Sequence, residues 1–128
     1  MALQTVAASI VGNLIDNPCP LPDGTVIDPF VTTLSATGTT QAGAAPILAE
    51  IVTVPNNTTA NGVILPVGIQ GQRIWVYGQL AAAGPIVYPP VGGTINNGTL
   101  NAGAALVARQ MRMYICSDTT GLNWIATA

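Results

Sequence analysis

Glycine and proline interrupt this sequence at short intervals and so limit the regular structure that it can form. Together they supply 24 of the 128 residues. Both residues destabilise helix interiors, so the pattern is unfavourable for long helices. Val, Ile and Thr supply another 39 residues, and their branched side chains favour the pleated environment of a strand. The sequence therefore predicts an all-β chain built from short strands.

Eight segments between these breakers have the length or the alternating character of strands. They are Thr32 to Thr37, Ile47 to Val54, Val63 to Leu65, Gln72 to Tyr77, Ile86 to Tyr88, Ala104 to Val107, Met111 to Cys116 and Leu122 to Ala126. Asn61-Gly62 and Asn97-Gly98 accept the positive φ that tight hairpin turns require. Pro55, Pro66 and the Pro89-Pro90 pair end strands, because proline has no N–H for a ladder. This pattern is typical of a sandwich or a barrel.

The stretch from Ala104 to Thr120 contains neither Gly nor Pro, and it admits two interpretations. Residues 104 to 111 have the propensity of a short helix. Residues 111 to 116 instead alternate with a period of two. We therefore expect a strand, a turn near residues 108 to 110, and a second strand.

Residues 1–30 differ in character from the rest of the chain. Four prolines between positions 18 and 29, together with Asp23-Gly24, favour a turn-rich, extended segment. We predict an N-terminal arm over residues 1–30 and a β-sandwich domain over residues 31–128. The apolar residues between Val6 and Ile15 are also compatible with one or two helical turns.

The scarcity of charge excludes most catalytic chemistry. Only eight residues carry a formal charge, and the sequence has no His and no Lys. His is the side chain best suited to acid–base work near neutral pH, and Lys is required for Schiff bases and phosphate loops. Three Arg in a chain of net charge −2 cannot neutralise a run of phosphates. We expect no enzyme activity, no cofactor, no metal and no nucleic-acid partner.

The same scarcity of charge favours a chain that is a subunit of a larger assembly. Eight charges on about 6,300 Å² of folded surface leave roughly one charge per 800 Å², far below the usual density of a soluble surface. A standard interface covers about 800 Å² per partner. A component of an assembly is therefore expected. Met1 to Ile15 carries no charge, but it is shorter than the roughly 20 residues that span a bilayer, so no membrane segment is predicted.

Carboxylates offer two weaker candidates for a site. Asp16, Asp23 and Asp28 are possible calcium ligands, but their spacing does not match a dense acidic loop, and turn or solvated positions explain them more simply. Glu50 with one Asp is a conceivable glycosidase pair, although nothing in the sequence brings the two together.

Cysteines and aromatic residues complete the candidates. Cys19 and Cys116 lack the spacing of zinc or redox motifs, and we expect two free thiols rather than a disulfide. Four aromatic residues invite the hypothesis of a sugar-binding platform, but a core or interface role is favoured because a small sandwich needs its largest side chains for packing. They are Trp75, Tyr77, Tyr88 and Trp124.

From Thr32 onward the order of short motifs resembles that of small head decoration, or cement, proteins of tailed bacteriophages. The motifs are Thr37-Gly38-Thr39-Thr40-Gln41-Ala42, Gly62-Val63-Ile64-Leu65-Pro66, Gly71 before a strand, Val87-Tyr88-Pro89, Gly93-Thr94-Ile95-Asn96 and a late Trp124. The similarity covers about three quarters of the chain. Residues 1–30 have no counterpart in this pattern.

This resemblance implies a β-sandwich of jelly-roll type. With the arm expected from the prolines, the predicted fold is a single antiparallel β-sandwich of jelly-roll type with an extended N-terminal arm. It also implies a homotrimer on the outer surface of the virion capsid, assembled in the host cytoplasm, with the major capsid protein as partner. We expect the subunit or capsid interface to contain apolar and aromatic residues of the arm and of one strand. They are Ile10, Leu14, Leu21, Phe30, Trp75 and Tyr77. The alternative function is a receptor- or glycan-binding module of a phage head fibre or tail fibre.

Overall fold

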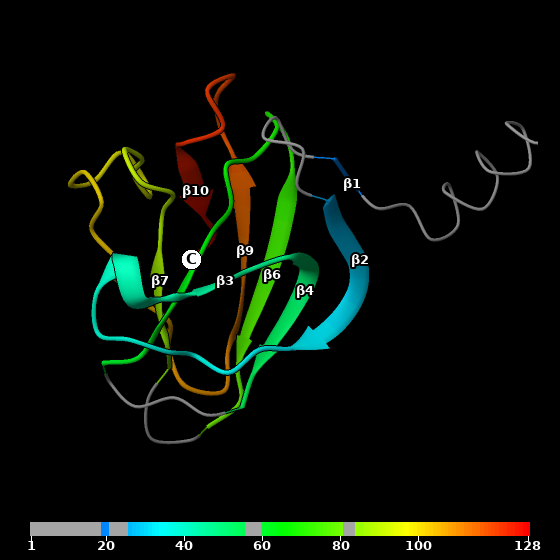
Figure 1. Ribbon diagram of the computed structural model, residues 1–128, viewed down its shortest axis with the longest axis vertical. Coiled ribbons are helices and arrows are strands. Elements are labelled where there is room, and N and C mark those ends of the chain that lie inside the picture. The colour runs from blue at the N-terminus through cyan, green and yellow to red at the C-terminus, as the bar shows by residue number, and fades with distance from the viewer. Residues whose placement is uncertain (1–18, 21–25, 56–59, 81–83) are drawn as a thin grey trace, which may run out of the picture.

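A computed structural model describes residues 19–20, 26–55, 60–80 and 84–128, and the side chains of those from residue 31 onward (Figure 1). Its elements are β1 (Cys19–Pro20), β2 (Val26–Thr33), the 3₁₀ turn η1 (Gln41–Gly43), β3 (Ala45–Pro46), β4 (Ala49–Val54), β5 (Gly62–Ile64), β6 (Arg73–Gly78), β7 (Ile86–Tyr88), β8 (Ala104–Ala105), β9 (Met111–Cys116) and β10 (Trp124–Ala126). The all-β prediction is confirmed. No helix in the described ranges is both long and apolar enough to cross a bilayer.

The strands form two sheets, and neither sheet is closed. The larger has the order β1-β2-β4-β6-β9-β10, and the smaller has the order β3-β5-β7-β8. Both sheets are mixed. β2, β4 and β6 run parallel to one another, and so do β3, β5 and β7. The antiparallel pairs include β7 with β8, β6 with β9 and β9 with β10. The prediction of a wholly antiparallel arrangement is therefore wrong, and this strand order does not confirm a jelly roll.

The parallel pairs arise because the chain alternates between the two sheets. It passes from β2 through β3 to β4, then through β5 to β6 and on to β7. Parallel neighbours need a long crossover connection, and here each crossover contains a strand of the opposite sheet. In Figure 1, β4 and β6 consequently run in the same direction, and β9 runs against them.

The predicted boundary after residue 30 falls inside a strand. β2 begins at Val26 and continues to Thr33, and it pairs with β4 from Asp28↔Ala49 to Thr33↔Thr53. β1 pairs antiparallel with β2 at Cys19↔Ile27 and Pro20↔Val26. The last residues of the predicted arm are therefore strands of the larger sheet, while residues 1–18 and 21–25 lie outside the described residues.

The stretch after Ala104 follows the strand-turn-strand interpretation rather than the helical one. β8 and β9 lie in different sheets and are joined by a turn at residues 106 to 110. Arg109 has φ 55, and its N–H donates to the carbonyl oxygen of Gly78 at 2.8 Å. The short β8 ends in the smaller sheet, and β9 then lies between β6 and β10 in the larger one.

The two Asn-Gly pairs behave differently from each other. Asn96 and Asn97 both have φ 54 in a turn that the N–H of Gly98 closes on the carbonyl of Ile95 at 2.9 Å. Gly62, in contrast, has no positive φ and is the first residue of β5. A Cβ at Gly62 would strike the ring of Tyr88, so this glycine serves close packing, and the predicted hairpin turn at residues 61–62 is wrong.

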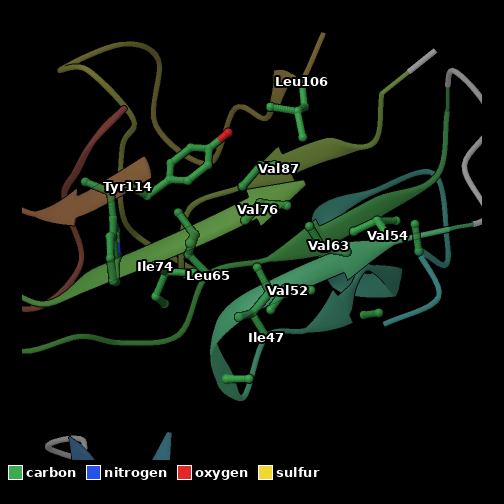
Figure 2. Packing of buried hydrophobic residues seen from close by; sticks show 14 of the residues in the cluster. Ile47, Val52, Val54, Val63, Leu65, Ile74, Val76, Val87, Leu106 and Tyr114 are labelled. Carbon is green, nitrogen blue, oxygen red and sulfur yellow. The ribbon is translucent and has the colours of Figure 1, made fainter. Parts of the chain in front are cut away.

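The core lies between the two sheets. Side chains of the larger sheet, such as Val52, Ile74 and Val76, meet Val63 and Val87 of the smaller sheet (Figure 2). Tyr114 is fully buried in the same cluster. Burial raises the pKa of Tyr114 to about 12, because desolvation disfavours the phenolate. Because side chains alternate between the two faces of a strand, the opposite face of the larger sheet lies outside the core.

Asp118 organises the turn between β9 and β10. Its carboxylate accepts hydrogen bonds from Thr120 Oγ1 at 2.9 Å, from the N–H of Gly121 at 3.1 Å and from Asn123 Nδ2. Hydrogen bonds from Asn123, and then those from Thr120 and Gly121, hold the pKa of Asp118 below its usual value of 3.8. Donors aimed at an ionised oxygen favour the charged form.

Replacement of Asp118 by alanine is expected to lower stability at pH 7 and to have less effect in acid. Because the folded-state pKa is lowered, the contribution is present above the usual value of 3.8 and is lost as pH falls through the lower folded value. Urea midpoints of the native and Asp118→Ala proteins at pH 7 and pH 2.5 check this. If the urea midpoints of the two proteins differ by the same amount at both pH values, the prediction is contradicted.

Candidate interaction surface

The face of the larger sheet that points away from the core is the best candidate for a functional surface. Side chains alternate between the two faces of a strand, so burying Ile74, Val76 and Tyr114 turns their neighbours outward. We call this surface the outer face. It consists of Val31 and Thr33 of β2, Ile51 and Thr53 of β4, Arg73, Trp75 and Tyr77 of β6, Met111, Met113 and Ile115 of β9, and Ile125 of β10.

Strand register arranges these residues in rows across the sheet. Trp75 lies between Ile51 and Met113. Val31 of β2 continues the same row on the far side of Ile51. Tyr77 lies between Thr53 and Met111 in the next row. In the third row, Arg73 is followed by Ile115 and Ile125. The rows place long apolar and aromatic side chains next to one another on a broad surface.

The outer face is open to solvent and nearly uncharged. Val31, Met111 and Ile125 are exposed, and Trp75 and Tyr77 are half-buried by their neighbours in the rows. Arg73 is the single charged residue among the members of the outer face. Such a surface binds by removing apolar area from water.

The dimensions of the outer face approach those of a protein interface. Five strands about 4.8 Å apart and three rows about 6.8 Å apart span about 19 Å by about 14 Å between outermost backbone positions. With side chains included, the area is on the order of 500 Å², whereas a standard interface covers about 800 Å² per partner. The area is within the range of about 300–600 Å² of the largest apolar patch on a typical monomer, and such a patch is often functional.

Part of the outer face coincides with the residues expected at an interface. Trp75 and Tyr77, two of the six predicted interface residues, lie side by side on the outer face. Phe30 is in β2, and its side chain is outside the described part of the chain. Ile10, Leu14 and Leu21 lie outside the described residues. Met111 and Met113 were missed as surface residues, although the period-two alternation of residues 111 to 116 carried the signal.

The four aromatic residues do not form one platform. Trp124 and Tyr88 are buried, and the hydroxyl of Tyr88 donates to the carbonyl of Thr39 at 3.3 Å. Trp75 and Tyr77 alone reach the outer face. The expectation that the aromatic residues serve packing holds for Trp124 and Tyr88, and the other two are available for contact with a partner.

The remaining candidates from the sequence are carboxylates and a cysteine. Asp28 is in β2, and Asp16 and Asp23 lie outside the described residues. In the part of the chain that the structure describes, no three His, Cys, Asp or Glu residues come together as metal ligands would. Cys116 is a buried free thiol, and burial raises the pKa of Cys116.

Comparison with known proteins adds no relative. No protein-family model, no curated protein and no solved structure matches this chain. The case for a function therefore depends on the chemistry of the chain's own surfaces.

Proposed function

We propose that this chain is a structural subunit that works in an assembly, and specifically a decoration protein of a tailed-bacteriophage capsid. The observation that carries the proposal is the outer face, a broad apolar surface with one charged residue, Arg73. The capsid as partner is taken from the sequence resemblance to head decoration proteins. In this role the protein binds the outside of the shell and holds neighbouring major capsid subunits together.

The proposed mechanism depends on rigidity and on repeated weak contacts. Two sheets sharing one core form a stiff body, so a contact at one point fixes the position of the others. Self-association as a homotrimer through the outer face multiplies each contact with the capsid, because a second contact within one assembly forms at high effective concentration. Modest individual patches then resist the outward force of packaged DNA. A jelly-roll relationship is not needed for this mechanism.

Binding to heads is expected to tolerate salt. A surface with few charges gains little from Coulomb attraction, so screening removes little of its affinity. Sedimentation of the purified protein with DNA-filled heads in 0.1 M and 1 M NaCl tests this, and we expect the bound fraction to differ by less than about two-fold. Release in 1 M NaCl, or no binding at either salt concentration, contradicts the proposal.

A glycan- or receptor-binding module is the alternative outcome of the same tests. Trp75 and Tyr77 offer two rings for stacking, and Thr53 beside Tyr77 offers one hydroxyl. The other neighbours in the rows, Ile51, Met113 and Met111, have no hydroxyl, amide or carboxylate group to orient a sugar. Saturable binding in a glycan array by a protein that does not bind heads favours this alternative.

A further inference from the structure

A second apolar surface lies away from the outer face, at the carboxyl ends of three parallel strands. A groove of about 350 Å³ opens where β3, β5 and β7 end. Its size is near the lower end of ligand pockets, which hold roughly 300–1,000 Å³. It is lined by Pro46, Ile47, Leu48, Ile64, Leu65, Pro66, Val67, Pro90 and Val91.

Strand direction and proline explain why this groove exists. The carboxyl ends of parallel neighbours meet at the same edge of the sheet, and here each strand either ends on a proline or is followed by one within two residues. Proline has no N–H with which to continue a ladder. At the floor, the N–H of Ile47 donates to Ile64 at 3.0 Å and the N–H of Leu65 donates to Tyr88 at 2.9 Å. These two N–H groups therefore already have hydrogen-bond acceptors and are not available to a ligand.

The chemistry of the groove selects an uncharged, apolar occupant. Ile47 and Leu65 are fully buried members of the core cluster (Figure 2) that also line the groove, whereas the lining residues Leu48 and Val91 are 50% and 70% exposed. None of the lining residues has a side-chain hydrogen-bond donor or acceptor. Affinity must come from apolar area removed from water, so phosphates, sugars and charged peptides are poor ligands.

We propose that this groove binds residues 1–15 of the chain. That segment has no charged side chain, and ten of its residues are apolar (Met1, Ala2, Leu3, Val6, Ala7, Ala8, Ile10, Val11, Leu14 and Ile15). Fifteen residues reach up to about 50 Å when extended, and a chain of this length folds to a diameter of about 36 Å. The segment is thus long enough to reach the groove of its own copy or of a neighbour.

Photo-crosslinking of the full chain tests this assignment directly. A benzophenone amino acid replaces Val91 in the groove, and a matched control replaces Leu100, which is 59% exposed and is not a lining residue. Pepsin digestion suits the analysis because a chain with three Arg and no Lys yields few tryptic peptides. We expect crosslinks from position 91 to residues 1–15 at least ten-fold above those from position 100. Crosslinks mainly to other residues, or equal yields from both positions, overturn the proposal.

A mixture of isotopically light and heavy protein identifies the copy that supplies the segment. In an equal mixture of freely exchanging copies, crosslinks between two copies give light-heavy products in half of the pairs, whereas crosslinks within one copy give none. Either origin supports occupancy by residues 1–15, and the mixed pair in addition joins two subunits. Neither readout requires a capsid, so a failure here leaves the proposed function untouched, and the reverse also holds.

Proteolysis gives a second, independent readout in the full chain. Leu48→Asp places a charge in the groove wall and is expected to weaken binding of the segment. Chymotrypsin cleavage after Leu3 or Leu14 should then accelerate at least ten-fold, with Leu100→Asp as the control that leaves the rate unchanged. Equal cleavage rates in native and Leu48→Asp proteins with unchanged unfolding midpoints contradict the proposal.

Discussion

Replacement of Gly84 by alanine is expected to lower the free energy of unfolding by about 3 kcal/mol. A Cβ at Gly84 would overlap the carbonyl oxygen of Leu106. The two segments cannot simply separate, because the N–H of Leu106 donates to the carbonyl of Pro85 at 2.9 Å and Ile86 pairs with Ala105. The substitution must therefore disrupt the pairing of β7 with β8. Chemical denaturation followed by tryptophan fluorescence measures the loss.

Gly71 provides the matched control for this substitution. A Cβ at Gly71 meets nothing within 4 Å, although its φ of +87 disfavours alanine. We expect Gly71→Ala to cost about 1 kcal/mol through backbone strain alone. If the Gly84→Ala protein is no less stable than the Gly71→Ala protein, then Gly84 does not lie as close to Leu106 as described.

Replacement of Trp75 by glutamate is expected to weaken self-association about 100-fold. Buried tryptophans at the centre of an interface contribute 2 kcal/mol or more, and a carboxylate without a partner adds a desolvation penalty. Trp75 lies in the middle row of the outer face, between Ile51 and Met113. Sedimentation velocity over a range of concentrations gives the dissociation constant.

Two further variants separate loss of contact from loss of folding. Met111 on the outer face and Val107 outside it are both 50% exposed. Met111→Glu should weaken association, and Val107→Glu should not, while both keep the native unfolding midpoint. Equal effects of the two variants would mean that general surface charge, rather than the outer face, controls association.

The strand positions were largely predictable because they depend on local chemistry. The segments predicted at Ile86 to Tyr88 and Met111 to Cys116 match β7 and β9, and both end where a proline or a polar turn follows. In β6, most of which lies within the predicted segment Gln72 to Tyr77, burial alternates: Ile74 and Val76 are buried, whereas Trp75 and Tyr77 are half-buried. Period-two alternation is visible in a sequence because it needs no information about distant residues.

Strand direction was not predictable in the same way. β4 and β6 are parallel because the connection between them passes through β5 in the other sheet. The Asn61-Gly62 pair has the chemistry of a hairpin turn, yet Gly62 is required for close approach to Tyr88. Which strands pair depends on contacts between residues far apart in the sequence. No local pattern in a single sequence indicates these contacts.

The candidate surfaces show the same division. The sequence singled out Trp75 and Tyr77, but only the register with β4 and β9 reveals the apolar rows around them. The groove joins Leu48, Val67 and Val91 from three separate connections, so no spacing in the sequence indicates it.

The mass of the purified native chain in solution is the most direct test of the claim that this protein works in an assembly. We predict a mass near three times the 13.0 kDa of one chain, measured by light scattering coupled to size exclusion at micromolar concentration. A constant mass of 13.0 kDa up to millimolar concentration, together with no binding to phage heads, would contradict it.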